Sequence, residues 1–389
     1  MAGLVIDADG HIMEDHKDLF AHLKGNFSEM NWHSTWPMFD ADGWQRGLSR
    51  KGKREDPDAE AWIRFQNEHG VDLAVLYPTS ALALGMIQLP AWASALAQGY
   101  NDWLYHRFTS QSPRLKGVAL LAPQDPKAAA AELRRCVKDL GFSAGLLPSV
   151  TNNRIPLYGS PAFHEIYDEA QKLDVPLTIH GGVSQNLGLD RLCSFLEAHM
   201  LEHPVGLFVQ ITNMMFQGVF QEFPKLRMAY LEAGAGWVPF MMDRMEEDYE
   251  KFAARLAPHL KSPPSKFFKS GNIFFTMEVE ERTAPYIPEL VHPDVIMWAS
   301  DFPHERERDQ FGGDLPHLMA RQDLSDEFKR KMLYDNPVRF YRFSEGDIAA
   351  VKKVKEINET HTRQSVSARW IFYRPNSFFT NPSSSNLFR

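Results

Sequence analysis

The sequence contains few cysteines: Cys136 and Cys193 are the two present among 389 residues. Two cysteines cannot form a disulfide framework, and such a low content is typical of proteins that fold in a reducing compartment. The first residues also show no basic stretch followed by a long apolar core, so we expect no secretory signal. These absences together predict a cytoplasmic protein.

Positive charge is also in deficit. The chain has 42 Lys and Arg residues against 50 Asp and Glu residues, for a formal net charge of −8. No basic arm or stripe stands out, which removes the simplest electrostatic basis for nucleic-acid binding. No apolar run approaches the roughly 18 residues that a membrane-spanning helix needs. We therefore expect small molecules and other protein chains as partners, and neither nucleic acid nor a membrane.

An alternation of strand-like and helix-like segments fills most of the chain. The expected strands are residues 4–6, 71–77, 115–121, 142–147, 175–179, 226–231, 272–278 and 295–298. The expected helices are residues 59–69, 91–111, 125–140, 161–173, a long region that ends near 223, one that begins near 237, 284–291, 325–334, 337–341 and 348–357. Such alternation implies a parallel sheet with helical crossovers, and eight units predict an α/β fold of the (β/α)8 TIM-barrel type over residues 1–345.

An open doubly wound sheet is the alternative to a barrel. Such a fold usually carries a glycine-rich phosphate-binding turn after its first strand, and this turn is missing here. Polar residues instead follow several of the expected strands, whereas a doubly wound sheet gathers them at one switch point. The barrel is therefore the expected fold.

Two segments fall outside the alternation. Residues 16–60 show no clean periodicity, and a long irregular insertion of this kind usually forms a lid or a subunit contact. Residues 346–389 contain one expected helix and then a Ser-, Asn- and Pro-rich tail that cannot form a core by itself. We expect this C-terminal segment to be partly disordered or to contact another subunit in a homo- or hetero-oligomer.

The end of the first strand carries potential metal ligands. Asp9 and His11 are two residues apart, so both side chains point to the same face if the backbone stays extended. A carboxylate and an imidazole on one face are suited to binding a metal ion. The alternative is a solvated acidic loop with an incidental histidine.

Similar residues follow later strands. His180 ends the fifth expected strand, Glu232 the sixth and Asp301 the eighth, with Glu14 and His304 close by in sequence. Because the carboxyl ends of barrel strands converge on one face, these side chains are expected to meet there. Imidazole and carboxylate ligands without cysteine are typical of a divalent transition-metal site.

Each of these residues also has a structural alternative. His180 can be a core histidine bonded to the backbone. Glu232 can pair with Arg244, His304 can merely orient Asp301, and Glu14 can act as a local cap or ion-pair partner.

A second histidine pair, His199 and His203, lies four residues apart on an expected helix, a spacing that can bind a metal. The surrounding residues do not match the zinc-protease pattern, and Pro204 predicts a break in the helix. We therefore expect no metal site at this pair.

Several of these segments resemble the amidohydrolase-related (amidohydrolase 2) branch of the amidohydrolase superfamily. The matching segments are residues 5–14, 178–182, 218–226, 231–237 and 299–304, within a resemblance that runs from about residue 4 to 342. The resemblance implies a metal-dependent (β/α)8 barrel, usually oligomeric. Its members include decarboxylases, hydratases, carbon–carbon and amide hydrolases, and a few non-haem metal oxygenases.

The sequence departs from this family pattern at two positions. The first strand of the superfamily usually carries His-x-His, but here Asp9 takes the first place and His11 the second. Glu232 stands where many members have a histidine, whereas His180 and Asp301 fit the pattern. The implied ligands are therefore Asp9, His11, His180, Glu232 and Asp301. This harder, more anionic set shifts preference from zinc towards iron or manganese, in one ion or two, with Glu14 as a candidate bridging ligand.

Three reactions are compatible with this site. The first expectation is hydrolysis or decarboxylation of a small carboxylate- or carbonyl-bearing substrate, in which Asp301, His304 and Glu14 are the candidate catalytic residues. The alternative is a carboxylate-rich iron or iron–manganese centre that binds dioxygen and hydroxylates a small molecule. A partner subunit with a degenerate, structural metal site is the non-enzymatic hypothesis.

Overall fold

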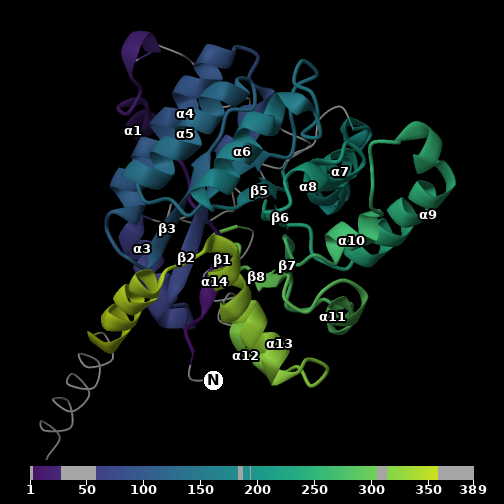
Figure 1. Ribbon diagram of the computed structural model, residues 1–389. Coiled ribbons are helices and arrows are strands. Elements are labelled where there is room, and N and C mark those ends of the chain that lie inside the picture. The colour runs from purple at the N-terminus through teal and green to yellow at the C-terminus, as the bar shows by residue number, and fades with distance from the viewer. Residues whose placement is uncertain (1–2, 28–57, 183–186, 193, 305–312, 358–389) are drawn as a thin grey trace, which may run out of the picture.

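The computed structural model describes residues 3–27, 58–182, 187–192, 194–304 and 313–357. Eight parallel strands lie in sequence order in one sheet that curves into a barrel (Figure 1). The strands are β1 (Ile6–His11), β2 (Leu73–Tyr77), β3 (Leu115–Leu120), β4 (Ala144–Pro148), β5 (Leu177–His180), β6 (Met228–Leu231), β7 (Ile273–Met277) and β8 (Ile296–Trp298). The predicted (β/α)8 fold is confirmed, and each predicted strand overlaps or adjoins an observed one.

The ends of the first and last strands close the barrel. The backbone N–H of Asp301 donates to the carbonyl of Asp9 at 3.2 Å, and the N–H of His11 donates to the carbonyl of Phe302 at 2.8 Å. The strands are buried along nearly their whole length because helices cover them outside and side chains fill the barrel inside. This burial explains the apolar runs of the other strands, whereas β1 buries the polar residues Asp7, Asp9 and His11.

The helices that follow the strands cover the outside of the barrel (Figure 1). They are α1 (His16–Phe20), α3 (Ala59–His69), α4 (Pro90–Leu104), α5 (Pro126–Asp139), α6 (His164–Leu173), α7 (Phe195–Phe216), α8 (Val219–Glu222), α9 (Val238–Leu256), α10 (Pro264–Phe268), α11 (Ile287–Leu290), α12 (Asp314–Ala320), α13 (Asp326–Arg330) and α14 (Asn336–Tyr341). The sharpest boundaries carry capping residues: Asp58 caps α3, and Asp125 followed by Pro126 begins α5. The predicted helix 91–111 ends earlier as an α-helix and continues as a π-helical turn, Tyr105–Thr109.

Helix α7 contradicts one prediction. The helix runs through Pro204, where the sequence predicts a break. A proline inside a helix removes one backbone hydrogen bond and strains the preceding turn, but it does not end the helix when packing holds both halves in place. Leu207, Ile211 and Met214 on the following turns are fully buried, which supplies this packing.

The segments outside the barrel alternation are described in part. Of the predicted insertion at 16–60, residues 16–27 form α1 and a short 3-10 turn, and residues 28–57 lie outside the described residues. Residues 345–357 form a helix, held to the barrel by ion pairs of Lys355 with Asp72 at 2.9 Å and of Asp347 with Lys116 at 2.5 Å. The predicted tail from residue 358 also lies outside the described residues. Within the described residues, no helix has the length and apolar character needed to cross a membrane.

Candidate metal centre

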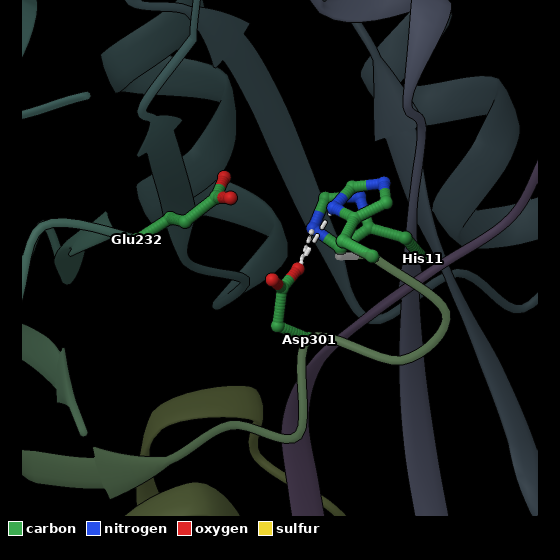
Figure 2. Close-up of side chains that lie close together, drawn as sticks. His11, Glu232 and Asp301 are labelled. Carbon is green, nitrogen blue, oxygen red and sulfur yellow. Dashed lines mark ion pairs between the residues drawn. The ribbon is translucent and has the colours of Figure 1, made fainter. Parts of the chain in front are cut away.

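The carboxyl ends of four strands bring the predicted ligands together. Asp9 and His11 come from β1, His180 ends β5, Glu232 follows β6 and Asp301 follows β8. Figure 2 shows the carboxylates of Glu232 and Asp301 on the same side of the His11 imidazole. The ligand atoms of Asp9, His11 and His180 all lie within 4.8 Å of one another, as do those of a second group, His11, Glu232, Asp301 and His304.

Two imidazoles are oriented by the backbone. Nδ1 of His11 donates to the carbonyl of Pro78 at 2.8 Å, and Nδ1 of His180 donates to the carbonyl of Gly181 at 2.7 Å. A carbonyl oxygen only accepts, so the Nε2 atom of each neutral ring carries the lone pair. Both Nε2 atoms face carboxylates. Nε2 of His180 lies 3.2 Å from Oδ2 of Asp9, and Nε2 of His11 lies 3.4 Å from Oδ1 of Asp301. This second-nitrogen anchoring is how metal-binding histidines are usually held.

The residues present fit a divalent ion. Ligands at about 2.0–2.2 Å from a common ion lie roughly 3.0–3.6 Å from each other, which matches the distances between these nitrogen and oxygen atoms. Nε2 of His11 is buried and makes no hydrogen bond within the described residues, as expected of an atom reserved for a metal. Two carboxylates, Asp9 and Asp301, balance the charge of a divalent ion.

Burial and mutual proximity shift the proton affinities of the cluster. Burial lowers the pKa of His11 well below its usual value, and the neighbouring His304 and His180 lower it further. Burial raises the pKa of Asp9. Burial opposes a charge on His180, but the Asp9 carboxylate, the Gly181 carbonyl and Asp301 together outweigh it and raise the pKa of His180. A proton and a metal ion therefore compete for the space between Asp9 and His180.

Glu232 borders the cluster from a different side. Its carboxylate oxygens lie 3.3 Å from Nδ1 of His180 and 3.6 Å from Nε2 of His203. Arg244, the alternative partner considered from the sequence, pairs with Glu247 at 2.7 Å instead. His203 reaches the site from α7 because the glycine at 181 lets that helix approach closely: a Cβ there would stand 2.9 Å from Cβ of His203. The four-residue spacing of His199 and His203 is the sequence signal for this contact, and α7 continues through Pro204, where the sequence predicts a break.

His304 lies against Asp301 and His11. Its Nδ1 is 2.8 Å from Oδ1 of Asp301, and its ring centroid is 4.0 Å from that of His11. Its Nε2 is 2.8 Å from Oγ1 of Thr79, a residue that the sequence did not single out. His304 is 4% exposed, so the surrounding side chains shield its ring from solvent.

Glu14 serves as an anchor for the loop that follows β2. Its carboxylate accepts hydrogen bonds from the backbone N–H groups of Thr79, Ser80 and Ala81, at 3.1, 3.0 and 2.9 Å. Burial raises the pKa of Glu14 by more than these hydrogen bonds lower it, so the pKa lies above its usual value. Glu14 belongs to neither of the two ligand groups within the described residues. In this structure the carboxylate binds backbone N–H groups, and the catalytic or bridging role of Glu14 stays a prediction.

Asp7 is a buried acid that the sequence analysis did not select. It accepts hydrogen bonds from the backbone N–H and the hydroxyl of Ser300, at 2.9 and 2.6 Å, and so joins β1 to the residue before Asp301. Burial raises the pKa of Asp7 to about 7. Its two-residue spacing from Asp9 was the signal, but a register irregularity between Asp7 and Gly10 breaks the simple alternation of β1.

Two site carboxylates sit on unusual backbone. Glu232 has φ 60° and Asp301 has φ 54°, in the left-handed region that non-glycine residues rarely adopt. Such conformations cost about 1–3 kcal/mol each and persist where the surrounding structure enforces them. The abrupt turn at each strand end directs both carboxylates towards the histidines.

Comparisons with known proteins place this geometry in context. Residues 6–343 match the family model described as amidohydrolase. The gamma-resorcylate decarboxylase of a Polaromonas species is 30% identical over 258 residues, which cover 62% of this chain and 76% of that protein. These matches confirm the resemblance predicted from the sequence.

Solved structures share the fold. A dihydroxybenzoic acid decarboxylase from Polaromonas, with bound manganese and 2-nitroresorcinol, superposes with a TM-score of 0.68 at 21% identity, covering 87% of this chain and 97% of that one. The 5-carboxyvanillate decarboxylase of Sphingomonas paucimobilis gives a TM-score of 0.66 at 20% identity, covering 88% and 99%.

Proposed function

Because the chain belongs to the amidohydrolase family and is a metal-dependent enzyme of the hydrolase or lyase type, we propose that it is a decarboxylase of small aromatic or conjugated carboxylates. The observation that carries the proposal is the convergence of Asp9, His11, His180 and Asp301 at the carboxyl ends of three barrel strands. The names of the relatives, decarboxylases of resorcylate, dihydroxybenzoate and carboxyvanillate, support this reaction over hydrolysis and oxygenation.

Asp9, His11, His180 and Asp301 would hold the ion, and Glu232, whose carboxylate lies near His11 and Asp301, would complete the set. When bound, a divalent ion supplies a Lewis acid that grips a substrate carboxylate or neighbouring oxygen and stabilises developing negative charge. The hard oxygen ligands favour manganese or iron over zinc. The manganese in the Polaromonas structure supports the first of these.

Decarboxylation breaks one carbon–carbon bond, leaves its electron pair on the substrate carbon and requires a proton there. The proton donor must be reachable by the substrate. The Asp301 and Glu232 side chains are 24% and 15% exposed, whereas that of Asp9 is 3% exposed. We assign proton delivery to Asp301, which is the most exposed of these carboxylates.

The test measures metal content and carbon dioxide release. The purified protein, stripped and reloaded with Mn²⁺, Fe²⁺ or Zn²⁺, is assayed with 2,6-dihydroxybenzoate and 5-carboxyvanillate. We expect carbon dioxide release without a reductant and, in deuterated water, one deuterium at the carbon that lost the carboxyl group. Oxygen consumption that depends on a reductant, with no carbon dioxide formed, would instead identify an oxygenase. Failure of the wild-type protein to bind any divalent ion would contradict the proposal.

A further inference from the structure

Three of the buried imidazoles of the site have one ring nitrogen held by a hydrogen-bond partner and the other facing a carboxylate. In His11 and His180, one ring nitrogen is anchored to a backbone carbonyl and the other faces a carboxylate. His304 has the same arrangement with the nitrogens exchanged: Nε2 contacts Oγ1 of Thr79, and Nδ1 faces Asp301. Whether His304 presents a proton or a lone pair to Asp301 depends on the direction of its bond with Thr79.

The direction of that bond follows from counting protons. The Thr79 hydroxyl has one hydrogen, and it donates this hydrogen to the carbonyl of Ile12 at 2.8 Å. The Ile12 carbonyl can only accept, so the hydroxyl has no hydrogen left for His304. The 2.8 Å contact therefore requires that Nε2 of His304 carry the hydrogen and donate it to Thr79. In the neutral ring, the lone pair is then on Nδ1.

The lone pair on Nδ1 faces the group of candidate metal ligands. Nδ1 lies 2.8 Å from Oδ1 of Asp301, a separation close to that of two adjacent ligands on one ion. The same pair belongs to the group, with His11 and Glu232, whose ligand atoms all lie within 4.8 Å of one another. In the neutral ring, Nδ1 and Oδ1 are both acceptors and are placed to share an ion, whereas a direct hydrogen bond between them requires a second proton on the ring.

We propose that Thr79 is a positioning residue that fixes His304 with its Nδ1 lone pair towards the ion, which makes His304 a further metal ligand. The inference rests on the metal site of the proposed function. Glu14 supports this arrangement. Its carboxylate accepts hydrogen bonds from the backbone N–H of Thr79 and of the two residues after it, and so holds Thr79 in place. Glu14, Thr79 and His304 thus form one chain of hydrogen bonds that ends at the ion.

The test compares Thr79→Val with Thr79→Ser. Valine keeps the shape of the side chain but removes both hydrogen bonds, and serine retains the hydroxyl. Each variant is loaded with Co²⁺ for its visible absorption spectrum and titrated with Mn²⁺ against a competing chelator. We expect Thr79→Val to change the Co²⁺ spectrum and weaken Mn²⁺ binding about 10- to 100-fold, and Thr79→Ser to restore both. Ser80→Ala is the matched control, because Ser80 contributes its backbone N–H to Glu14.

A double-mutant cycle isolates the route through His304. His304→Gln should alter the spectrum in the same way, and adding Thr79→Val to it should weaken binding no further. Additive losses would show that Thr79 acts elsewhere and would overturn the inference, as would a Thr79→Val protein with wild-type spectrum and affinity. Circular dichroism and the melting temperature establish that each variant folds; if Thr79→Val does not fold, the spectrum of the His304→Gln protein decides whether His304 is a ligand. Absence of metal binding by the wild-type protein would instead overturn the proposed function itself.

Discussion

Nε2 of His11 lies 3.4 Å from Oδ1 of Asp301, and this contact joins the end of the first strand to the end of the last. The backbone of the same region closes the barrel, through the bond from the N–H of Asp301 to the carbonyl of Asp9. Barrel closure and assembly of the metal site therefore depend on the same few residues. The expected effects of altering this region follow from that dependence.

Asp9→Asn should remove a metal ligand while keeping the fold. The amide matches the shape of the carboxylate but lacks its charge, so we expect Mn²⁺ affinity to fall by more than about 10-fold. Chelator competition and metal analysis of the purified protein measure this loss. Asp168→Asn, at an exposed acid paired with Lys172 on α6, is the control and should bind metal normally. Unchanged metal content in Asp9→Asn would rule out the ligand set.

Glu232→Gln should separate metal binding from turnover. Glu232 contacts Nδ1 of His180, the nitrogen that does not face Asp9, and so it contributes less to ion binding than Asp9 does. We expect a smaller loss of Mn²⁺ affinity than in Asp9→Asn, together with a fall in kcat of about 10- to 100-fold. The exposed Glu165→Gln on α6 is the control. A loss of metal equal to that of Asp9→Asn would make Glu232 a principal ligand.

Glu14→Gln tests the positioning role against the predicted catalytic one. A glutamine amide replaces one carboxylate oxygen by an NH2 group, which cannot accept the backbone hydrogen bonds that this oxygen now receives: one bond at Oε2, or two at Oε1. Loss of these bonds should lower the free energy of unfolding by about 1–3 kcal/mol. The neighbouring Asp15→Asn is the control, because asparagine caps α1 as well as aspartate does. A fully stable Glu14→Gln protein with no turnover would support a catalytic Glu14 instead.

Asp7 should make the stability of the metal-free protein depend on pH. Burial raises its pKa to about 7 in the folded state, whereas the unfolded chain has the ordinary value near 3.9. The folded protein therefore retains a proton that the unfolded chain releases, so this stabilisation is full below about pH 4 and is lost as pH rises to about 7.

Asp7→Asn should remove this dependence. Its stability relative to the wild type should increase between pH 4 and 7, by an amount of the order of 1–4 kcal/mol. Urea unfolding at a series of pH values, with a chelator present, measures the difference. The exposed Asp139→Asn on α5 provides the baseline. Parallel pH profiles for wild type and Asp7→Asn would show that Asp7 keeps an ordinary pKa.

The roles of individual residues were less predictable than their locations. Asp9, His11, His180 and Asp301 meet as expected because each lies at or just beyond the carboxyl end of a strand, and these ends lie on the same face of the barrel. Glu14 lies close to them in sequence, but its carboxylate turns towards the backbone of a neighbouring loop. His203 comes from a helix, and its approach depends on the glycine at 181 and on a helix that continues through Pro204.

The alternation of strands and helices, the barrel and the face on which polar residues gather could all be predicted from the amino-acid sequence, because apolar runs must be buried and parallel strands need crossovers. Which ring nitrogens and carboxylate oxygens lie together is visible only in the folded chain. This placement depends on contacts between residues far apart in the chain, such as Pro78 with His11 and Thr79 with His304. These contacts set the direction of each hydrogen bond, and hydrogen-bond direction leaves no periodic trace in a sequence.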